Sequence, residues 1–269
     1  MSERPIGMFD SGFGGLTVAR ALIDLLPMEH LVYVGDTGRY PYGPRPLGEV
    51  RSFARQIARW LVDEHDIKLL VVACNNASAA ALEILRAELD IPVVGVIEPG
   101  VRSLLLATTE RRVGVIATVG TVASGAYQQA VATIAGDDVD LTCAACPGFV
   151  EFVERGETEG DQVLVLAERL LAPIVDAKVD ALLLGCTHYP YLARVIGDVM
   201  GSAVTLVSSA DETAFDVHAL LHDSELARHD GAGEHRFFSS GEVTWFRDLG
   251  QRLLGPEIRD VQPVRWESP

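Results

Sequence analysis

The sequence predicts an α/β protein made of two similar domains, each a mainly parallel sheet flanked by helices. Short apolar runs alternate with longer stretches of helical periodicity, as in parallel strands joined by crossover helices. The pattern of the first hundred residues begins again near residue 113. The 269 residues, 48% of them hydrophobic and 22% charged, are sufficient for two hydrophobic cores.

The first half contains four short apolar runs that predict buried strands. They lie at residues 4–12, 30–36, 67–74 and 91–97. The stretches between them have apolar residues at helical spacing and predict helices at 15–27, 47–65 and 78–89. The Pro and Gly content of residues 37–46 predicts a loop.

A connecting helix is predicted over 98–112, and then the alternation repeats. We expect strands at 113–121, 140–148 and 203–212, an apolar run at 179–190, and helices at 124–136 and 191–200, with a loop over 146–157 leading into 161–177. The shared period is far longer than that of a solenoid repeat, so it indicates duplication of a whole domain.

Residues 208–269 have no counterpart in the repeat. They contain a predicted helix over 210–226 and a strand followed by a helix over 234–255. We expect this segment to fold back onto the first domain. The predicted division is therefore a discontinuous first domain of residues 1–97 plus 208–269, and a second domain of residues 98–207.

The net charge of −16 and the lack of a Lys/Arg cluster argue against binding to nucleic acid or to an anionic membrane surface. No run of about 18 uninterrupted apolar residues and no signal peptide occur, so a cytoplasmic protein is expected. The four cysteines are too few and too scattered for a disulfide scaffold, and we expect free thiols.

Two apolar runs end in a cysteine followed at once by polar residues, at Cys74 and Cys186. Asp10 and Thr118 also occupy matching places in the two halves. Ligands of open α/β sheets bind at the carboxyl ends of strands, where both cysteines fall. The following helix N-termini are expected to lower the thiol pKa from about 8.5 toward neutrality. One thiolate and one thiol on opposite faces of a carbon can invert it, the first removing a proton and the second supplying one.

Five segments resemble glutamate racemases, members of the cofactor-independent aspartate/glutamate racemase superfamily. They are "FDSGFGGLTV", "YPYGPRP", "ACNNAS", "CPGFVEFVERG" and "LGCTHYPYL". The resemblance runs from about residue 6 to residue 213. It implies interconversion of L- and D-glutamate without pyridoxal phosphate or any other cofactor, supply of D-glutamate for peptidoglycan, and a homodimer with no nucleic-acid or membrane partner.

The resemblance also implies roles for individual residues. Cys74 and Cys186 correspond to the acid/base thiols, assisted by Asp10, His188 and Glu154. The positions implied to bind substrate are Asp10, Ser11, Pro41, Tyr42, Gly43, Asn75, Asn76, Thr118, Thr121, Thr187 and His188. No metal ligand is implied. Two positions depart from the family pattern: Asn76 stands where Thr or Ser is usual, and Gly38 stands where alanine often precedes Arg39.

Other interpretations of these residues remain open. Asp10 can cap the helix that follows it, and Tyr42 and Gly43 can be ordinary turn residues. Cys143 and Cys146 have the spacing of a redox pair or half a zinc site, but a strand places them on opposite faces, which favours packing. Two further functions are also open: a racemase of the same superfamily acting on aspartate or on a hydantoin- or arylmalonate-type substrate, and a non-catalytic protein that binds small anions.

Overall fold

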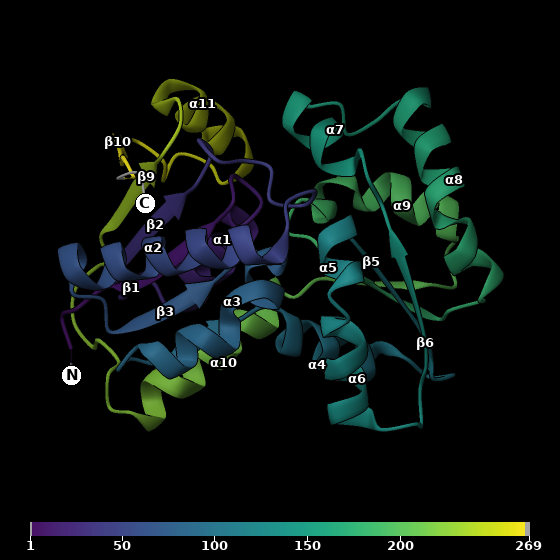
Figure 1. The fold of residues 1–269 in the computed structure, drawn as a ribbon, viewed down its shortest axis with the longest axis horizontal. Helices are drawn as coiled ribbons and strands as arrows, with labels where there is room; N and C mark the ends of the chain where they lie inside the picture. The colour runs from purple at the N-terminus through teal and green to yellow at the C-terminus, as the bar shows by residue number, and fades with distance from the viewer. Residues whose placement is uncertain (1, 267–269) are drawn as a thin grey trace.

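The computed structural model of the chain describes residues 2–266, which form two halves, each a parallel sheet between layers of helices (Figure 1). The first half contains the strands β1 (Ile6–Asp10), β2 (Leu31–Gly35), β3 (Leu69–Val72), β4 (Val93–Gly95), β9 (His235–Ser239) and β10 (Val261–Pro263). Its helices are α1 (Leu16–Leu25), α2 (Leu47–His65), α3 (Asn75–Glu88), α10 (Ala210–Asp223) and α11 (Val243–Leu253).

The second half is built on a shorter sheet. Its strands are β5 (Arg112–Ala117), β6 (Asp140–Ala145), β7 (Ala181–Leu184) and β8 (Thr205–Val207). Its helices are α4 (Ile97–Ala107), α5 (Val119–Ala123), α6 (Ala126–Ala135), α7 (Phe149–Arg155), α8 (Asp161–Asp176), the 3-10 helix η1 (Tyr189–Leu192) and α9 (Ala193–Met200). None of the helices in the described part of the chain is long and apolar enough to cross a membrane.

The two sheets share one strand order. The first is ordered β10-β9-β2-β1-β3-β4 and the second β6-β5-β7-β8, and every pair of neighbours is parallel. The run β2-β1-β3-β4 of the first sheet therefore corresponds strand for strand to the whole second sheet. The predicted fold class is confirmed.

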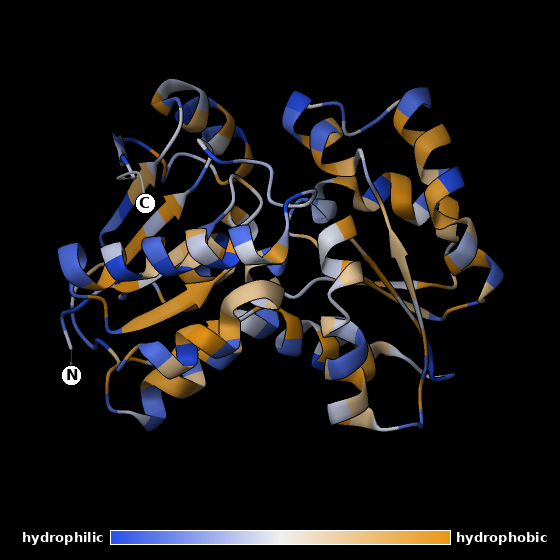
Figure 2. Ribbon diagram, viewed as in Figure 1, coloured by the Kyte–Doolittle hydropathy of each residue, from blue (hydrophilic) through white to orange (hydrophobic). Residues whose placement is uncertain are grey.

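Both faces of each sheet are covered, because successive side chains of a strand point to opposite faces. In β1, Met8 packs in a core with α1, α10 and α11, whereas Phe9 packs on the other face with α2 and α3. The second sheet packs against α7, α8 and α9 on one face and against α4 and α6 on the other. Figure 2 shows the resulting pattern, with apolar strands inside and polar outer helix faces.

Several predicted elements differ from the structure. The loop expected over 146–157 contains α7, whose Phe149 and Val153 lie four residues apart and are both buried, the spacing of an amphipathic helix. The strand expected over 113–121 ends at Ala117, because Thr118 caps α5 by accepting from the Thr121 N–H. The strand β10 was not predicted, since its three residues are largely exposed and show no apolar alternation.

The chain after residue 208 returns to the first half. Helix α10 packs on α1 and also contacts α4, and β9 pairs with β2. Both marked chain ends lie in this half (Figure 1). We propose that the two halves are the two domains, divided near residues 98 and 207.

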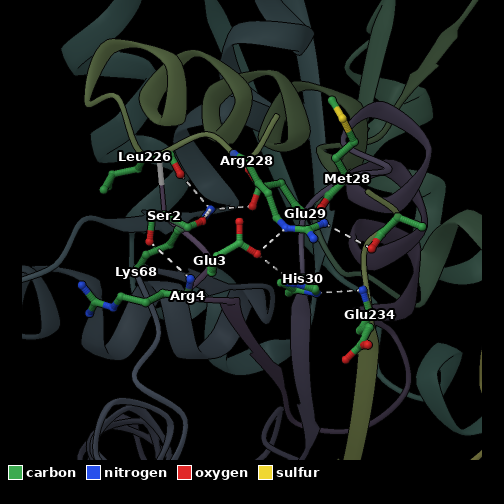
Figure 3. Close-up of polar contacts among 11 residues, drawn as sticks. Ser2, Glu3, Arg4, Met28, Glu29, His30, Lys68, Leu226, Arg228 and Glu234 are labelled. Atoms are coloured by element: carbon green, nitrogen blue, oxygen red, sulfur yellow. Dashed lines mark hydrogen bonds and ion pairs between the residues drawn. The ribbon is translucent and has the colours of Figure 1, made fainter. Parts of the chain in front are cut away.

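A buried ion pair fixes the amino-terminal edge of the first sheet (Figure 3). The side chain of Lys68, just before β3, is fully buried, and its Nζ lies 2.6 Å from Glu29 Oε2. Lys68 Nζ also donates to the carbonyl oxygens of Ser2, at 3.1 Å, and Leu226, at 2.8 Å. Glu29 Oε1 accepts from the Arg228 N–H at 2.7 Å. The pair therefore connects four separate segments of the chain.

Removing the cation of this pair should destabilise the protein strongly. Lys68→Met leaves Glu29 buried without its counter-ion, so we expect the free energy of unfolding in urea to fall by about 3 kcal/mol or more. The double variant Lys68→Met/Glu29→Gln removes the uncompensated charge and should recover part of the loss. Arg55→Ala, which breaks a partly exposed pair with Glu88, should cost less than about 1 kcal/mol. A Lys68→Met protein as stable as Arg55→Ala would contradict this interpretation.

Candidate active site

A cavity of about 120 Å³ lies between the two halves, at the carboxyl ends of their strands. The first half contributes Ser11, after β1, and Cys74, after β3. The second half contributes Thr118, after β5, and Cys186, after β7. Corresponding strands of the two sheets thus supply both cysteines to one cavity, and its volume restricts the ligand to a small molecule.

The structure places the predicted site residues in or directly behind this cavity. Those that line it are Ser11, Pro41, Tyr42, Gly43, Cys74, Asn75, Asn76, Thr118, Cys186, Thr187 and His188. Three others lie one hydrogen bond behind the lining. Thr187 Oγ1 donates to Asp10 Oδ2 at 3.3 Å, Thr121 Oγ1 lies 3.1 Å from Thr118 Oγ1, and Glu154 contacts His188. The roles of all these residues remain predictions.

Cys74 is the N-cap residue of α3 and is buried. Burial, and after it the nearby Asp10 carboxylate, together raise the pKa of its thiol to about 12, although hydrogen bonds from the Ala77 N–H and Ser11 act in the opposite direction. The expectation of a lowered pKa is therefore wrong for Cys74, because loss of hydration outweighs the helix N-terminus. At neutral pH this sulfur carries its proton.

Cys186 has a different environment. Its Sγ lies 3.9 Å from His188 Nδ1, and His188 Nε2 lies 3.1 Å from Glu154 Oε1. Burial by itself lowers the pKa of His188, but the hydrogen bonds to Cys186 and Glu154 outweigh it and raise the pKa to about 10. The imidazole is therefore a cation at neutral pH, and a cation beside a sulfur stabilises negative charge on it. The site thus has two arms, each a cysteine with its neighbouring side chain, and they differ: Asp10 neighbours Cys74, and His188 neighbours Cys186.

Asp36, which follows β2, holds the loop that carries Tyr42 into the cavity. Its Oδ2 accepts from Arg39 Nε at 2.7 Å and from the Tyr42 hydroxyl. Its Oδ1 accepts from Ser240 Oγ and from Trp266 Nε1, both at 2.6 Å. One buried carboxylate thus joins the loop to the segments after β9 and β10. No role for Asp36 was predicted from the sequence, although its place at a strand end was the available indication.

The two halves also meet through hydrogen bonds beside the cavity. The Gly120 N–H donates to the Gly43 carbonyl at 3.1 Å, and Asn76 Nδ2 donates to Thr118 Oγ1 at 2.8 Å. A Cβ atom on Gly120 would lie 2.8 Å from Asn76 Oδ1, so the amide fits here only against a glycine. Asn76, the departure from the family pattern, therefore bridges the halves in this structure.

The cavity has further lining residues that the sequence analysis missed. They are Tyr40, Pro44, Val119, Cys146, Pro147, Gly148, Val150 and Glu151. Cys146 was predicted only to pack, but it is buried at the end of β6 and lines the cavity, whereas Cys143 is half-buried within the strand. Its position directly after a strand was the indication for it. All four cysteines are free, and within residues 2–266 no three His, Cys, Asp or Glu side chains form a metal cluster.

Comparisons with known proteins agree with this geometry. A family model described as Asp/Glu/Hydantoin racemase matches residues 16–215 of the chain. A glutamate racemase from Parafrankia sp. is 53% identical over 263 residues, which cover 97% of this chain and 94% of that protein.

Solved structures resemble the chain over nearly its full length. A glutamate racemase isoform from Bacillus anthracis matches with a TM-score of 0.93 at 38% identity, covering 99% of this chain and 98% of the other. Glutamate racemase from Francisella tularensis in complex with D-glutamate matches with a TM-score of 0.90 at 32% identity and the same coverage. The family match over most of the sequence and these identities show that the chain belongs to the Asp/Glu/hydantoin racemase family.

Proposed function

We propose that the protein is a glutamate racemase, which interconverts L- and D-glutamate without a cofactor and supplies D-glutamate for peptidoglycan. The observation that carries this proposal is the pair of cysteines, Cys74 and Cys186, which reach one small cavity from corresponding strand ends of two similar halves. The names of the relatives, glutamate racemases at about 50% identity over nearly the whole chain, support the same substrate.

Racemisation requires a proton acceptor on one face of Cα and a proton donor on the other. In the proposed reaction one sulfur, as thiolate, takes the Cα proton and becomes a thiol. The second sulfur, as thiol, gives its proton to the opposite face of the carbanion and becomes a thiolate. Protons and charge balance, and the pair is left ready for the reverse reaction.

The two environments suggest a starting assignment. Cys74 is protonated and is therefore the donor, whereas Cys186, beside the His188 cation, is the acceptor. Thr187 Oγ1 donates to Asp10 and so connects the two arms. Hydroxyl groups of the lining, such as Ser11 and Thr118, are suited to donate hydrogen bonds to the substrate carboxylates.

The alternatives are less well supported. An aspartate racemase would share the two thiols, but the relatives that match nearly the whole chain at about 50% identity are glutamate racemases. A protein that only bound small anions would have no use for two thiols in one cavity. We also infer that the enzyme is a cytoplasmic homodimer. The homodimer is implied by the sequence resemblance, and the cytoplasmic location is the expectation from the sequence. Light scattering after size-exclusion chromatography tests the dimer.

Isotope exchange tests the reaction directly. Purified protein incubated with L-glutamate in D2O, with no cofactor added, should form D-glutamate with deuterium at Cα, detected by NMR and chiral chromatography. Cys74→Ala and Cys186→Ala should each lower the racemisation rate by at least about 10³-fold, because each removes one proton-transfer group. Cys143→Ala is the matched control, since this cysteine lies within β6 and is not among the described residues of the lining.

Two results would contradict the proposal. Turnover of aspartate without turnover of glutamate would select another substrate. Full racemase activity in Cys186→Ala would exclude the two-thiol mechanism.

The raised pKa of His188 predicts a specific pH dependence of stability. The folded protein holds the His188 proton up to a pKa of about 10, whereas an ordinary histidine loses it near 6.5. The contribution of this proton to the stability of the folded protein is therefore complete below pH 6.5 and is lost as the pH rises through about 10. Between pH 7 and pH 9, the free energy of unfolding in urea should fall more steeply for the wild type than for His188→Gln, by on the order of 1 kcal/mol per pH unit. Equal slopes for the two proteins would contradict the assignment of a protonated His188.

A further inference from the structure

Tyr127 connects the residues that flank the two cysteines. It belongs to α6 in the second half, is 1% exposed, and is not among the described residues that line the cavity. Its hydroxyl meets Asn75, which follows Cys74. Its ring meets Gly185, which precedes Cys186. A single side chain thus touches the neighbours of both thiols without reaching the cavity.

The contact with Asn75 fixes one side of an amide that lines the cavity. Asn75 Nδ2 donates to Tyr127 Oη at 2.8 Å. Asn75 Oδ1 is buried and has no hydrogen-bond partner in the described part of the protein. Buried acceptors are rarely left unpaired, because their loss of hydration is costly. Asn75 is one of the residues that line the cavity, so an unpaired buried oxygen on its side chain indicates a hydrogen-bond donor on the ligand.

The contact with Gly185 fixes the tyrosine itself. A Cβ atom on Gly185 would lie 2.9 Å from Tyr127 Cε2 and 3.0 Å from Oη. The ring therefore lies directly on the Gly185 backbone, and only glycine leaves room for it. Packing in the second half holds the ring, while its hydroxyl reaches across to the first half.

Glutamate at neutral pH has one hydrogen-bond donor group, its ammonium, because ionised carboxylates only accept. We propose that Tyr127 is a positioning residue: by binding Nδ2 it holds the Asn75 amide with Oδ1 toward the cavity, where Oδ1 accepts from the substrate ammonium. This inference rests on the proposed glutamate racemase function and deepens it. It explains why an amide, buried next to Cys74, is paired on one side only.

The variant Tyr127→Phe keeps the ring against Gly185 and removes only the hydroxyl. The amide of Asn75 is then free to turn, so the KM for L-glutamate should rise about 10-fold, the effect of one lost hydrogen bond. The value of kcat should change less than about threefold, because the contact is present both before and during proton transfer. Glutarate, which lacks the ammonium group, should inhibit the variant and the wild type equally well.

A double-variant comparison tests whether Tyr127 acts through Asn75. Asn75→Ala alone should raise the KM without changing glutarate inhibition. Tyr127→Phe/Asn75→Ala should be no worse than Asn75→Ala, because the hydroxyl has nothing left to orient. Tyr189→Phe is the matched control: it removes another buried hydroxyl from the second half, one that donates to the Cys146 carbonyl at 3.1 Å, and should leave the KM within about twofold.

The outcomes separate this inference from the function on which it rests. A wild type that does not racemise glutamate contradicts the proposed function. When the wild type is active, three results would overturn the positioning role. They are an unchanged KM in folded Tyr127→Phe, a loss of glutarate inhibition in that variant as large as the rise in KM, and additive effects on KM in the double variant. Circular dichroism establishes folding; should Tyr127→Phe not fold, a loss of glutarate inhibition in Asn75→Ala would still overturn recognition of the ammonium.

Discussion

In a parallel sheet every strand delivers its carboxyl end to the same edge, and the site depends on this constraint. β1 and β3 bring Asp10 and Cys74 to one edge, and β5 and β7 bring Thr118 and Cys186 to the equivalent edge of the second sheet. The two edges meet at the cavity. Two thiols in one cavity are therefore a consequence of duplicating one strand order and of the two carboxyl edges meeting.

Neighbouring side chains give the two duplicated arms different chemistry. Both cysteines are buried, but Cys74 lies near the Asp10 carboxylate and Cys186 beside the His188 imidazole. The first neighbour raises the thiol pKa, and the second places a cation by the sulfur. A two-thiol racemase needs such a difference, because one group must begin as the acid and the other as the base. Here the difference comes from side chains two or more residues away in sequence, outside the duplicated Cys positions.

Stability and function are anchored at opposite ends of the first sheet. The Lys68–Glu29 pair joins four chain segments at the amino-terminal edge, at the opposite end of β3 from Cys74. At the carboxyl edge, Asp36 orders the loop of Tyr42, and hydrogen bonds from Asn76 and Gly120 connect the halves. The alignment of the two arms therefore relies on contacts between the halves rather than on either sheet alone.

The sequence by itself determined the alternating fold, the repeat and the two cysteines at strand ends, because hydrophobic periodicity and strand-end residues are local properties. Even there, short or exposed elements such as β10 lacked a local pattern. Only the tertiary structure decided the protonation of Cys74, the pairing of Asn76 with Thr118, and the inclusion of Cys146 in the cavity. Each of these depends on burial or on a partner distant in sequence, and loss of hydration at Cys74 outweighed the helix N-terminus from which a lowered pKa was expected.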